Sequence, residues 1–275
     1  MPGRVAYFGP AGTFTELAAL QYAPDRELVA YPTISAVTKA IITGEVEQGV
    51  VPIENSLEGS VTDTLDLLIR EPSLSILQEL VLPIEHCLLV RPGTREADIK
   101  TIYSHPQALG QCRQFLESRF PKAVAAAALS TAAAAEQLRQ SQEPAAAIGT
   151  SRAAELYNMD VLARGIQDNL ANVTRFVVLG HNDHTPTGDD KTSLCFSFSD
   201  DQPGLLYGVM GELSRRNINL AKIESRPTRQ SLGRYIFLID LDGHRDDPQV
   251  KEAIESLRTQ TSMLKIFGSY PRAGA

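Results

Sequence analysis

One short stretch of this sequence, residues 166–176, carries most of its chemical capacity. Side-chain amides, a carboxylate, a hydroxyl and a guanidinium fall within it, and an apolar run at residues 176–179 ends at Gly180. A run of that length with β-branched residues is typical of a buried strand. Polar groups at the mouth of such a strand need hydrogen-bond partners, either among themselves or on a ligand. The stretch is therefore either a binding site or a loop held by its own polar residues.

Thr174 and Arg175 are the two members of this stretch that could act directly on a ligand. A threonine hydroxyl can donate and accept a hydrogen bond, and the planar guanidinium of an arginine suits a carboxylate. Neighbouring side chains of an extended strand point to opposite faces. We therefore expect only one of the two to face any given cleft.

A glycine-containing segment at residues 9–16 is a second candidate. It follows a predicted strand at residues 5–8, and Thr13 with Glu16 fits a capping box that opens a helix through Tyr22. Free N–H groups at such a helix start can hold a carboxylate or a phosphate. Helix capping alone explains the same residues, and the segment matches neither a P-loop nor a GxGxxG motif.

Glu54, Asn55 and Ser56 come directly after a third predicted strand, the apolar run at residues 49–53. In an open sheet, ligands gather where the carboxyl ends of the strands meet the next helices. A carboxylate, an amide and a hydroxyl at that position favour a binding role more than the same residues would on a helix face.

Ser104 and His105 follow another predicted strand and open a helix on which Gln107 and Gln111 lie one turn apart. The ordinary pKa of histidine suits acid–base chemistry. However, no carboxylate is near His105 in the sequence, so a hydrogen-bonding position at the helix start is the alternative interpretation.

Composition limits the class of protein. A length of 275 residues favours two domains, and a hydrophobic content of 43% is ordinary for a globular protein. Because no apolar run resembles a signal peptide or a membrane span, we expect a cytoplasmic protein without a membrane partner. The net charge is -7 and basic residues form no stripe with interleaved aromatics, which argues against a nucleic-acid partner.

The sequence offers little for a metal. Cys87, Cys112 and Cys195 are far apart in apolar patterns, so we expect buried thiols rather than disulfides or metal ligands. His181 and His184 could suggest a metal site, but the surrounding Pro, Gly and Asp residues favour a solvated linker.

The first 180 residues alternate strand and helix patterns; one of the helices follows Ser35, which we predict as its N-cap. These units predict two lobes with a ligand between them, lobe 1 at about residues 1–83 and 166–180 and lobe 2 at about 84–165. A linker is predicted at residues 181–191. Residues 192–275 show the order βαββαβ of a ferredoxin-like fold. This last domain has no acid–base constellation, which indicates a regulatory or assembly module.

Five motifs, in their order and spacing, resemble those of the prephenate dehydratase family: residues 9–15 (GPAGTFT), 51–56 (VPIENS), 104–109 (SHPQAL), 111–112 (QC) and 172–176 (NVTRF). The C-terminal part resembles an ACT domain, and the resemblance covers nearly the whole chain. It implies an α/β catalytic domain with the two-lobed type II periplasmic-binding-protein-like fold, followed by an α+β ferredoxin-like (βαββαβ) ACT domain. No chorismate mutase pattern precedes the dehydratase motifs.

The resemblance implies the conversion of prephenate to phenylpyruvate, carbon dioxide and water. Formation of an aromatic ring makes this reaction downhill, so we expect no metal and no other cofactor. By similarity, Thr174 is the catalytic residue that assists the departing hydroxyl. The substrate-binding residues carried over from the family motifs are Glu54, Asn55, Ser104 and Gln111. Thr13 and its turn would supply N–H groups to a carboxylate, and Arg175 is either a substrate ligand or a structural brace.

The resemblance also implies feedback control by L-phenylalanine. The effector would bind where two ACT domains pair, hence in a homodimer or homotetramer, near Gly204, Leu205, Glu224, Ser225, Arg226 and Pro227. In the family, the residue after this glycine is more often small, whereas here it is Leu205. This difference bears on the affinity for the effector. Three rivals stay open: an arogenate dehydratase, a non-catalytic amino-acid sensor, and a dimerisation module on a generic α/β domain.

Overall fold

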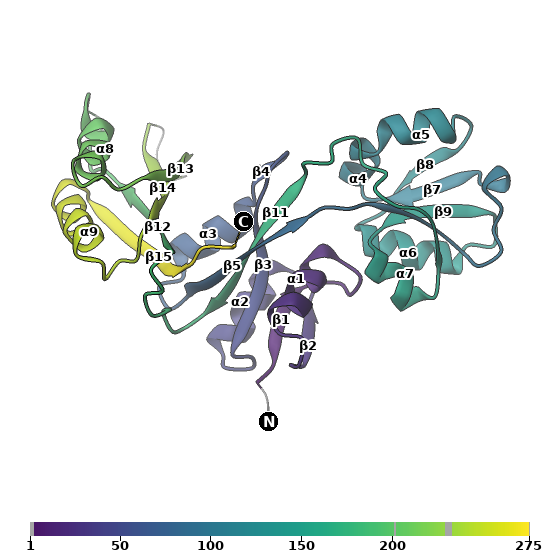
Figure 1. Cartoon of the computed structure of the whole chain (residues 1–275), viewed down its shortest axis with the longest axis horizontal. Helices are drawn as coiled ribbons and strands as arrows, with labels where there is room; N and C mark the ends of the chain where they lie inside the picture. The colour runs from purple at the N-terminus through teal and green to yellow at the C-terminus, as the bar shows by residue number, and fades with distance from the viewer. Residues whose placement is uncertain (1–2, 201, 229–232, 275) are drawn as a thin grey trace.

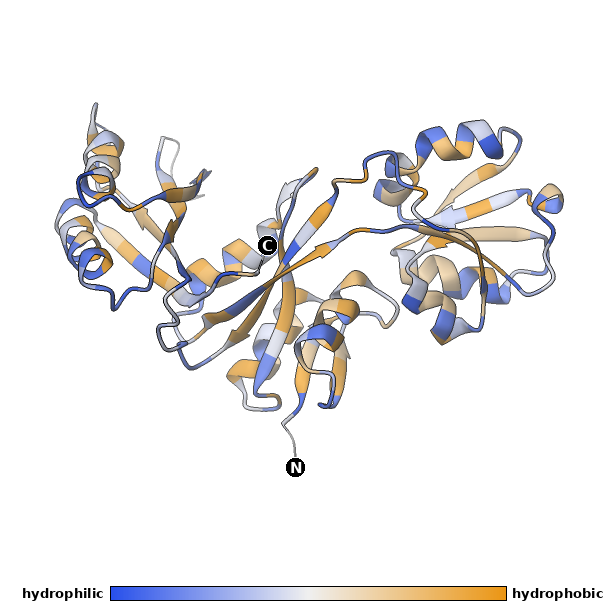
Figure 2. Ribbon diagram, in the orientation of Figure 1, coloured by the Kyte–Doolittle hydropathy of each residue, from blue (hydrophilic) through white to orange (hydrophobic). Residues whose placement is uncertain are grey.

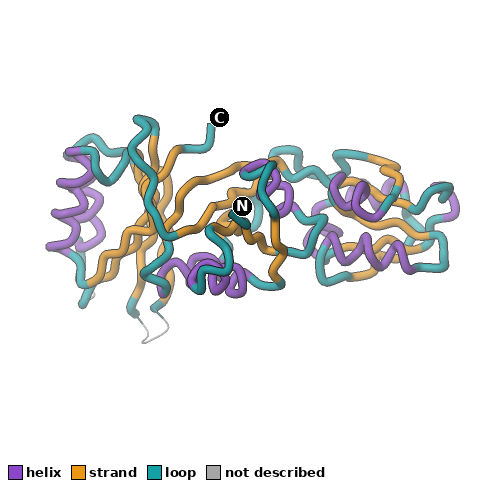
Figure 3. The backbone as a smooth tube through the Cα atoms, turned by 90° about the horizontal axis from the view of Figure 1, so that it is seen from below, coloured by secondary structure: helices purple, strands orange, loops and turns teal. Residues whose placement is uncertain are grey.

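The computed structural model describes residues 3–200, 202–228 and 233–274. The chain forms three bodies, each built on its own sheet (Figure 1). Seen from below, the C-terminal module, lobe 1 and lobe 2 follow one another along the longest axis (Figure 3). The ends of the two predicted domains, residues 1–2 and 275, lie outside the described residues, as do residues 201 and 229–232 of the C-terminal module.

Lobe 1 contains a mixed sheet with the order β2-β1-β3-β11-β5, and β4 pairs with β3. β1 is parallel to β2 and β3, whereas β11 runs antiparallel to both β3 and β5. The strands are β1 (Val5–Phe8), β2 (Leu28–Tyr31), β3 (Gln48–Asn55), β4 (Gly59–Ser60), β5 (Ser75–Pro83) and β11 (Val173–Gly180). The helices are α1 (Phe14–Tyr22), α2 (Ile34–Ile42) and α3 (Thr62–Arg70).

Lobe 2 contains a second mixed sheet with the order β10-β6-β9-β7-β8. Its strands are β6 (Cys87–Val90), β7 (Thr101–Ser104), β8 (Val124–Ala127), β9 (Ala145–Gly149) and β10 (Asp160–Ala163). Its helices are α4 (Pro106–Gln111), α5 (Arg113–Arg119), α6 (Thr131–Gln140) and α7 (Ser151–Tyr157), with a short 3-10 helix η1 (Glu96–Asp98).

The C-terminal module has the predicted order of elements and an antiparallel sheet with the order β13-β14-β12-β15. This is the ferredoxin-like arrangement. Its elements are β12 (Asp190–Ser197), α8 (Leu205–Arg215), β13 (Leu220–Pro227), β14 (Tyr235–Asp242), α9 (Pro248–Gln260) and β15 (Met263–Pro271). Its first strand therefore starts inside the predicted linker.

Local signals explain where the helices begin. Thr13 and Ser130 occupy N-caps, and the hydroxyl of each accepts a hydrogen bond from a backbone N–H three residues on. The prediction that Ser35 caps the next helix was wrong, because Thr33 is the cap and the helix begins at Ile34. Both residues have a capping hydroxyl, but starting at Ile34 buries that apolar side chain in the core of lobe 1.

Two segments, residues 84–86 and 164–172, connect the lobes. They are hydrogen-bonded to each other, since Ile84 N donates to Asn172 O at 2.9 Å and Ile166 N donates to His86 O at 3.1 Å. The lobes are thus joined by one narrow pair of segments, whose polar side chains lie beside the space between the lobes.

One hydrophobic core spans lobe 1 and the C-terminal module. Leu68 and Ile76 of lobe 1 belong to the same buried cluster as Cys195, Phe267 and Tyr270 of the module. A separate cluster lies between the module's sheet and its helices α8 and α9, and lobe 2 has clusters of its own. The apolar strands of all three bodies are visible in Figure 2. Lobe 1 and the module are therefore packed as one unit.

At Gly268, β15 of the module lies very close to the backbone of β5 in lobe 1. A Cβ atom at this position would collide with the backbone N and O of Ile76 in β5. We expect Gly268→Ala to lower the free energy of unfolding by about 1–3 kcal/mol, because backbone atoms of a packed strand cannot move aside cheaply. Thermal unfolding would measure this. Gly110→Ala, at a helical position with open space around it, is the matched control, and equal unfolding midpoints for both variants would contradict the prediction.

Cys87, Cys112 and Cys195 are free and buried, as predicted. Burial raises the pKa of the Cys112 and Cys195 thiols to about 12, so both are in the unreactive thiol form. Within residues 3–200, 202–228 and 233–274, no helix has the length and apolar character needed to cross a membrane.

Candidate active site

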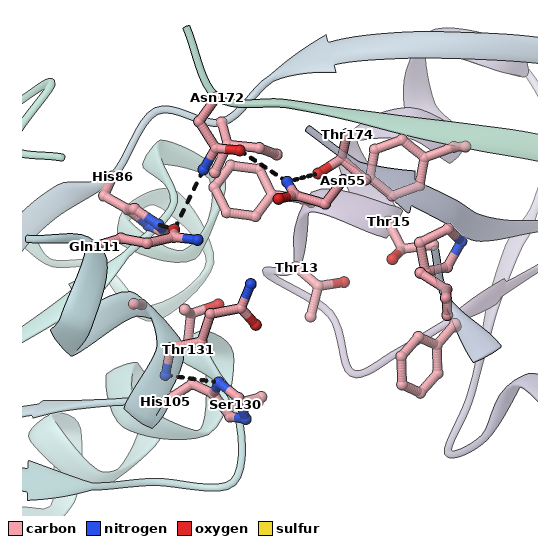
Figure 4. Close-up of a pocket in the computed structure, with 18 of the residues that line it drawn as sticks. Thr13, Thr15, Asn55, His86, His105, Gln111, Ser130, Thr131, Asn172 and Thr174 are labelled. Carbon is pink, nitrogen blue, oxygen red and sulfur yellow. Dashed lines mark hydrogen bonds between the residues drawn. The ribbon is translucent and has the colours of Figure 1, made fainter. Parts of the chain in front are cut away.

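A cavity of about 340 Å³ lies between the lobes, beside the crossing segments. Figure 4 shows side chains from both lobes arranged around this one space. The polar residues that line it are Thr13, Thr15, Asn55, His86, His105, Gln107, Gln111, Ser130, Thr131, Asn172 and Thr174. Aromatic and aliphatic side chains complete the wall, among them Phe8, Phe14, Ile84, Leu129 and Phe176. Such a mixture of apolar surface and a few converging polar groups is typical of a small-molecule site.

Thr174 and Asn55 form a cross-strand pair on the cavity side of the lobe 1 sheet. They lie opposite each other in β11 and β3, and Asn55 Nδ2 lies 2.8 Å from Thr174 Oγ1. Asn55 Oδ1 accepts hydrogen bonds from the backbone N–H groups of Leu57 and Glu58 at 3.0 and 3.1 Å. Because backbone N–H groups only donate, these two bonds fix which end of the amide is the oxygen. Thr174 Oγ1 therefore accepts from Asn55, and its own proton is free to donate to a ligand in the cavity that the Thr174 side chain lines (Figure 4).

The amide of Asn55 begins a chain of oriented amides along the cavity wall. Its Nδ2 also donates to Asn172 Oδ1 at 2.8 Å, and Asn172 Nδ2 donates to Gln111 Oε1 at 3.3 Å. Each amide is oriented by the one before it, so the NH₂ group of Gln111 is directed away from this network. Gln111 Nε2 is buried and has no hydrogen-bond partner among the described residues. It is a second donor available to a ligand.

His86 holds the same glutamine from the other side. Its Nε2 lies 3.0 Å from Gln111 Oε1, and its ring meets the ring of Phe14 edge-on with 5.6 Å between centroids. Since the glutamine oxygen accepts, Nε2 carries the proton of the neutral ring. Burial lowers the pKa of His86 below its ordinary value, which keeps the ring neutral. His86 thus acts on the cavity through Gln111.

The described lining has no permanently charged side chain. Among the described residues, no Lys, Arg, Asp or Glu lines the cavity. The starts of α1 and α6, one from each lobe, lie at its wall, with their caps Thr13 and Ser130 in the lining. First-turn N–H groups have no partner inside a helix, and the helix dipole favours a negative charge there. An anion in this cavity would be held by hydrogen-bond donors and dipoles rather than by cationic side chains.

The lobes also touch directly next to the cavity. Thr150 Oγ1 of lobe 2 donates to Gly12 O of lobe 1 at 2.7 Å, and Arg152 pairs with the buried Glu16 at 3.3 Å. Gly12 has a φ of 88°, and a Cβ there would lie 3.2 Å from the Cβ of Ala153. The turn before α1 therefore fits closely against the start of α7.

The structure brings four of the predicted catalytic-domain residues together at the cavity: Thr13, Asn55, Gln111 and Thr174. Ser104 lies elsewhere, fully buried, and its hydroxyl donates to Ile148 O at 2.9 Å between β7 and β9. The hydroxyl of Thr13 donates to Pro10 O and accepts from Glu16 N, so its proton is not free for a ligand. In the turn before it, Gly12 N donates to Glu16 Oε2 at 2.5 Å and is engaged as well.

Glu54 and Arg175 lie on the opposite face of the sheet from Asn55 and Thr174. Arg175 Nη2 lies 3.3 Å from Glu54 Oε2, and Arg175 Nη1 lies 2.6 Å from Asp240 Oδ2 of the C-terminal module. Burial opposes the charge of Arg175, yet Asp240 and its other neighbours outweigh burial and raise its pKa. Both terminal nitrogens of its guanidinium thus have acidic partners away from the cavity.

The predicted effector residues surround a different feature, in the C-terminal module. Gly204 and Leu205 line a hollow of about 210 Å³ together with Tyr235 and Phe237 of β14. Ser225 and Pro227 of β13 lie opposite Phe237 and Tyr235 and are exposed, whereas Glu224 and Arg226 alternate to the other face. There Glu224 Oε2 accepts from Ser60 Oγ at 2.5 Å and Arg226 pairs with Asp66 at 2.9 Å, both in lobe 1.

Sequence reasoning missed two residues of the cavity network, His86 and Asn172. His86 stands in a short crossing segment without a motif of its own, so nothing in the sequence linked it to Gln111. Asn172 belongs to the polar stretch before β11, and its side-chain amide was the available signal. His105 lies at the cavity as the N-cap of α4, where its Nδ1 accepts from Gln107 N at 3.3 Å.

Comparison with known proteins gives consistent matches. The sequence model of the prephenate dehydratase family matches residues 5–184, and that of the ACT domain matches residues 196–259. The bifunctional chorismate mutase/prephenate dehydratase of Stutzerimonas stutzeri is 40% identical over 274 residues, which cover 99% of this chain and 74% of the relative. The prephenate dehydratase of Bacillus subtilis (strain 168) is 39% identical over 279 residues, which cover 97% of this chain and 98% of the relative.

Solved structures match over nearly the whole chain. Prephenate dehydratase from Arthrobacter aurescens, in complex with L-Phe, has a TM-score of 0.91 and 38% identity, covering 98% of this chain and 90% of that chain. A structure described as GqqA, a novel type of quorum quenching acylase, has a TM-score of 0.89 and 32% identity, covering 98% of both chains. With the three sheets described above, these matches confirm the predicted fold class, a two-lobed type II periplasmic-binding-protein-like domain followed by an ACT domain.

Proposed function

The chain belongs to the prephenate dehydratase family, and from that premise we propose that it converts prephenate to phenylpyruvate, carbon dioxide and water. The observation that carries the proposal is the orientation of Thr174. Its hydroxyl oxygen accepts from Asn55, which leaves the hydroxyl proton free to donate to a ligand in the cavity between the lobes. A hydrogen-bond donor held in a fixed position, in a cavity that can accept an anion, can stabilise the negative charge that develops on a departing hydroxyl oxygen.

The reaction breaks two σ bonds, shifts one ring π bond between them and uses one proton. The bond from the ring to its carboxylate breaks and releases carbon dioxide, and the freed electron pair completes the aromatic ring as the C4–O bond breaks. The departing oxygen takes up a proton and leaves as water. We assign Thr174 to the hydrogen bond that stabilises negative charge developing on this oxygen. The Asn55 bond strengthens that donor, because a hydroxyl whose oxygen accepts a hydrogen bond donates better.

The remaining groups would bind and orient the dianion. We propose that Gln111 Nε2 and the first-turn N–H groups of α1 and α6 hold its carboxylates. The apolar wall, including Phe8, Phe14 and Phe176, leaves the reacting carboxylate poorly solvated, which favours its loss as a neutral gas. In this assignment Arg175 and Glu54 are braces behind the site, and Ser104 holds two strands of lobe 2 together.

The same lining favours prephenate over arogenate. Arogenate carries an ammonium group in place of the keto oxygen, and a buried ammonium needs an acceptor or a carboxylate partner. Among the described lining residues no carboxylate is present, and the helix starts present positive dipole ends. We expect kcat/KM for prephenate to exceed that for arogenate by roughly 100-fold or more, in side-by-side initial-rate assays. Equal values would identify the chain as a dehydratase that accepts both substrates.

The relative described as an acylase makes amide hydrolysis a second activity to measure. That reaction needs a hydroxyl or a water activated by a neighbouring base. In the described part of the lining, His86 is bonded to Gln111 and His105 to the backbone of Gln107, and no hydroxyl has a histidine as its hydrogen-bond partner. The arrangement favours dehydration over hydrolysis.

We further propose control by L-phenylalanine bound between two ACT modules of a homodimer or homotetramer in the cytoplasm. The relative from Arthrobacter aurescens was solved in complex with L-Phe. Here the hollow at Gly204 and Leu205 is lined by β14, and β14 pairs with β13, an edge strand whose outer side has no partner strand among the described residues. An edge strand of this kind can meet its equivalent in a second copy. Because β13 also contacts lobe 1 through Glu224 and Arg226, an effector at the hollow has a physical route to the catalytic domain.

Phenylpyruvate formation from prephenate by the purified protein, with and without L-phenylalanine, tests the proposal. We expect product in proportion to enzyme concentration and a rate that changes with phenylalanine. A folded protein that binds phenylalanine but forms no product would instead be an amino-acid sensor.

A further inference from the structure

The strand pair that carries Thr174 has a second face, which looks away from the cavity. Arg175 lies opposite Glu54 in β11 and β3, just as Thr174 lies opposite Asn55. Side chains alternate along a strand, so one face holds the Thr174–Asn55 pair and the back face holds the Arg175–Glu54 pair. The C-terminal module contacts this back face.

Asp240 of β14 makes the shortest of these contacts. Its Oδ2 lies 2.6 Å from Arg175 Nη1, and its Oδ1 accepts a hydrogen bond from Ser193 Oγ at 2.5 Å. Ser193 is bonded in turn to the hydroxyl of Tyr270 at 2.5 Å, and all three module residues are buried. Burial would raise the pKa of Asp240, but the charge of Arg175 and the hydrogen bonds outweigh burial and lower it. Asp240 is therefore a charged group held rigidly by the module's own core.

The other member of the back-face pair is bound by the same module. Glu54 Oε1 lies 3.1 Å from the ammonium of Lys222 in β13, while Glu54 Oε2 faces Arg175. Both residues directly behind the Thr174–Asn55 pair thus have an ion partner in the C-terminal module.

The charges behind the site are balanced. Arg175 and Lys191 carry positive charge, and Asp240 and Glu79 carry negative charge; Lys191 Nζ lies 2.8 Å from Glu79 and Arg175 Nη1 lies 3.4 Å from it. Removing one member leaves a buried charge without compensation, whereas removing Arg175 and Asp240 together leaves the Lys191–Glu79 pair intact and leaves Glu54 with its partner Lys222. The double variant can therefore show whether activity falls because the protein is less stable or because Thr174 is misplaced.

The backbone directly after the Arg175–Glu54 pair is irregular. The register of β11 against β3 shifts between Arg175 and Phe176, which lie opposite Glu54 and Pro52 and leave Ile53 as the extra residue of a bulge. A bulge redirects the side chains beside it, so its geometry depends on what holds it. We propose that Asp240 of the C-terminal module is a positioning residue for the dehydratase reaction, holding Arg175 so that Thr174 stays aligned with Asn55; this rests on the proposed function.

The test compares Asp240→Asn, Arg175→Met and the double variant with wild type, by thermal unfolding and by kcat and KM for prephenate. Each single variant should unfold at a lower temperature, and the double variant should regain part of that loss. The double variant should still show a kcat about 10- to 100-fold below wild type with KM changed less than threefold or so, since misplacement affects the transition state. If the Arg175–Asp240 ion pair only stabilises the fold, the kcat of the double variant should recover toward the wild-type value as its stability recovers. That result would overturn the positioning role.

Lys265→Met is the matched control. Lys265 also crosses from the module to lobe 1, where its ammonium donates to carbonyl groups at the end of α3, including Glu71 O at 2.8 Å, away from the Thr174 pair. Its loss should lower stability and leave kcat of the folded protein unchanged. If the double variant does not fold, Ser193→Ala provides the test, because it removes a hydrogen bond to Asp240 without changing any charge. A reduced kcat of this variant would support the positioning role of Asp240, and an unchanged kcat would overturn it. A wild type without turnover would refute the proposed function itself.

Discussion

Replacing Thr174 by valine is expected to lower kcat for prephenate about 10²–10³-fold, the scale seen when one donor to a developing oxyanion is removed. Valine keeps the β-branched shape that suits β11, and Thr174 is only 9% exposed, so the fold should tolerate the change. Asn55 Nδ2 would lose one acceptor but keep Asn172 Oδ1 and Val173 O. Steady-state kinetics with an unfolding control would measure the effect.

The alternative outcomes for Thr174→Val are distinct. A large rise in KM at constant kcat would mean that the hydroxyl binds the ground state and does not act on the departing oxygen. An unchanged kcat would assign the hydrogen bond to another donor of the wall, of which Gln111 Nε2 is the first to examine.

The second large effect is expected from Asn55→Asp, a change of nearly identical shape. A carboxylate at this position cannot donate to Thr174, so the threonine hydroxyl would donate to the new carboxylate and no longer to the substrate. The new negative charge would also repel a dianion. We expect kcat/KM at neutral pH to fall about 100-fold or more.

The pH dependence of the Asn55→Asp variant gives its own check. An aspartic acid at this position changes from a carboxylate to a neutral group that carries a proton as the pH falls through its pKa. Below that pKa the group is neutral and can donate again, so the variant should recover activity relative to wild type as the pH falls. Asn169→Asp adds the same charge at an exposed position outside the cavity and should have little effect at any pH. A flat ratio of variant to wild type across pH would contradict the donor assignment.

The general fold follows closely from the sequence. Apolar runs of strand length alternated with capped helices, and the pattern changed where the chain reached β12, so both the two-lobed domain and the ferredoxin-like module were predictable. Capping was predictable only to within a residue or two, because Thr33 and Ser35 are both competent caps and burial of Ile34 decides between them. The shared core of lobe 1 and the module was not predictable, since no local pattern tells which sheet face a second domain will cover.

The cavity was predictable where strand alternation applied. Thr174 and Arg175 were expected on opposite faces of a strand, and the structure places them so. Knowing which face was the cavity required β3, whose Asn55 lies opposite Thr174 and whose Glu54 lies opposite Arg175. Family motifs alone grouped all four, because a motif records position in the sequence and not the side of a sheet. His86 escaped prediction for a related reason: its partner Gln111 is brought to it only by the crossing of the chain between lobes.

The central claim is that a hydroxyl at position 174, oriented by Asn55, assists the departing oxygen. The most direct test is kcat of Thr174→Ser beside Thr174→Val. Serine keeps the hydroxyl and can accept from Asn55 Nδ2, so its kcat should lie within about tenfold of wild type while that of valine falls by about 10²–10³. Equal losses in both variants, with folding intact, would show that shape at this position matters and that its hydroxyl does not take part.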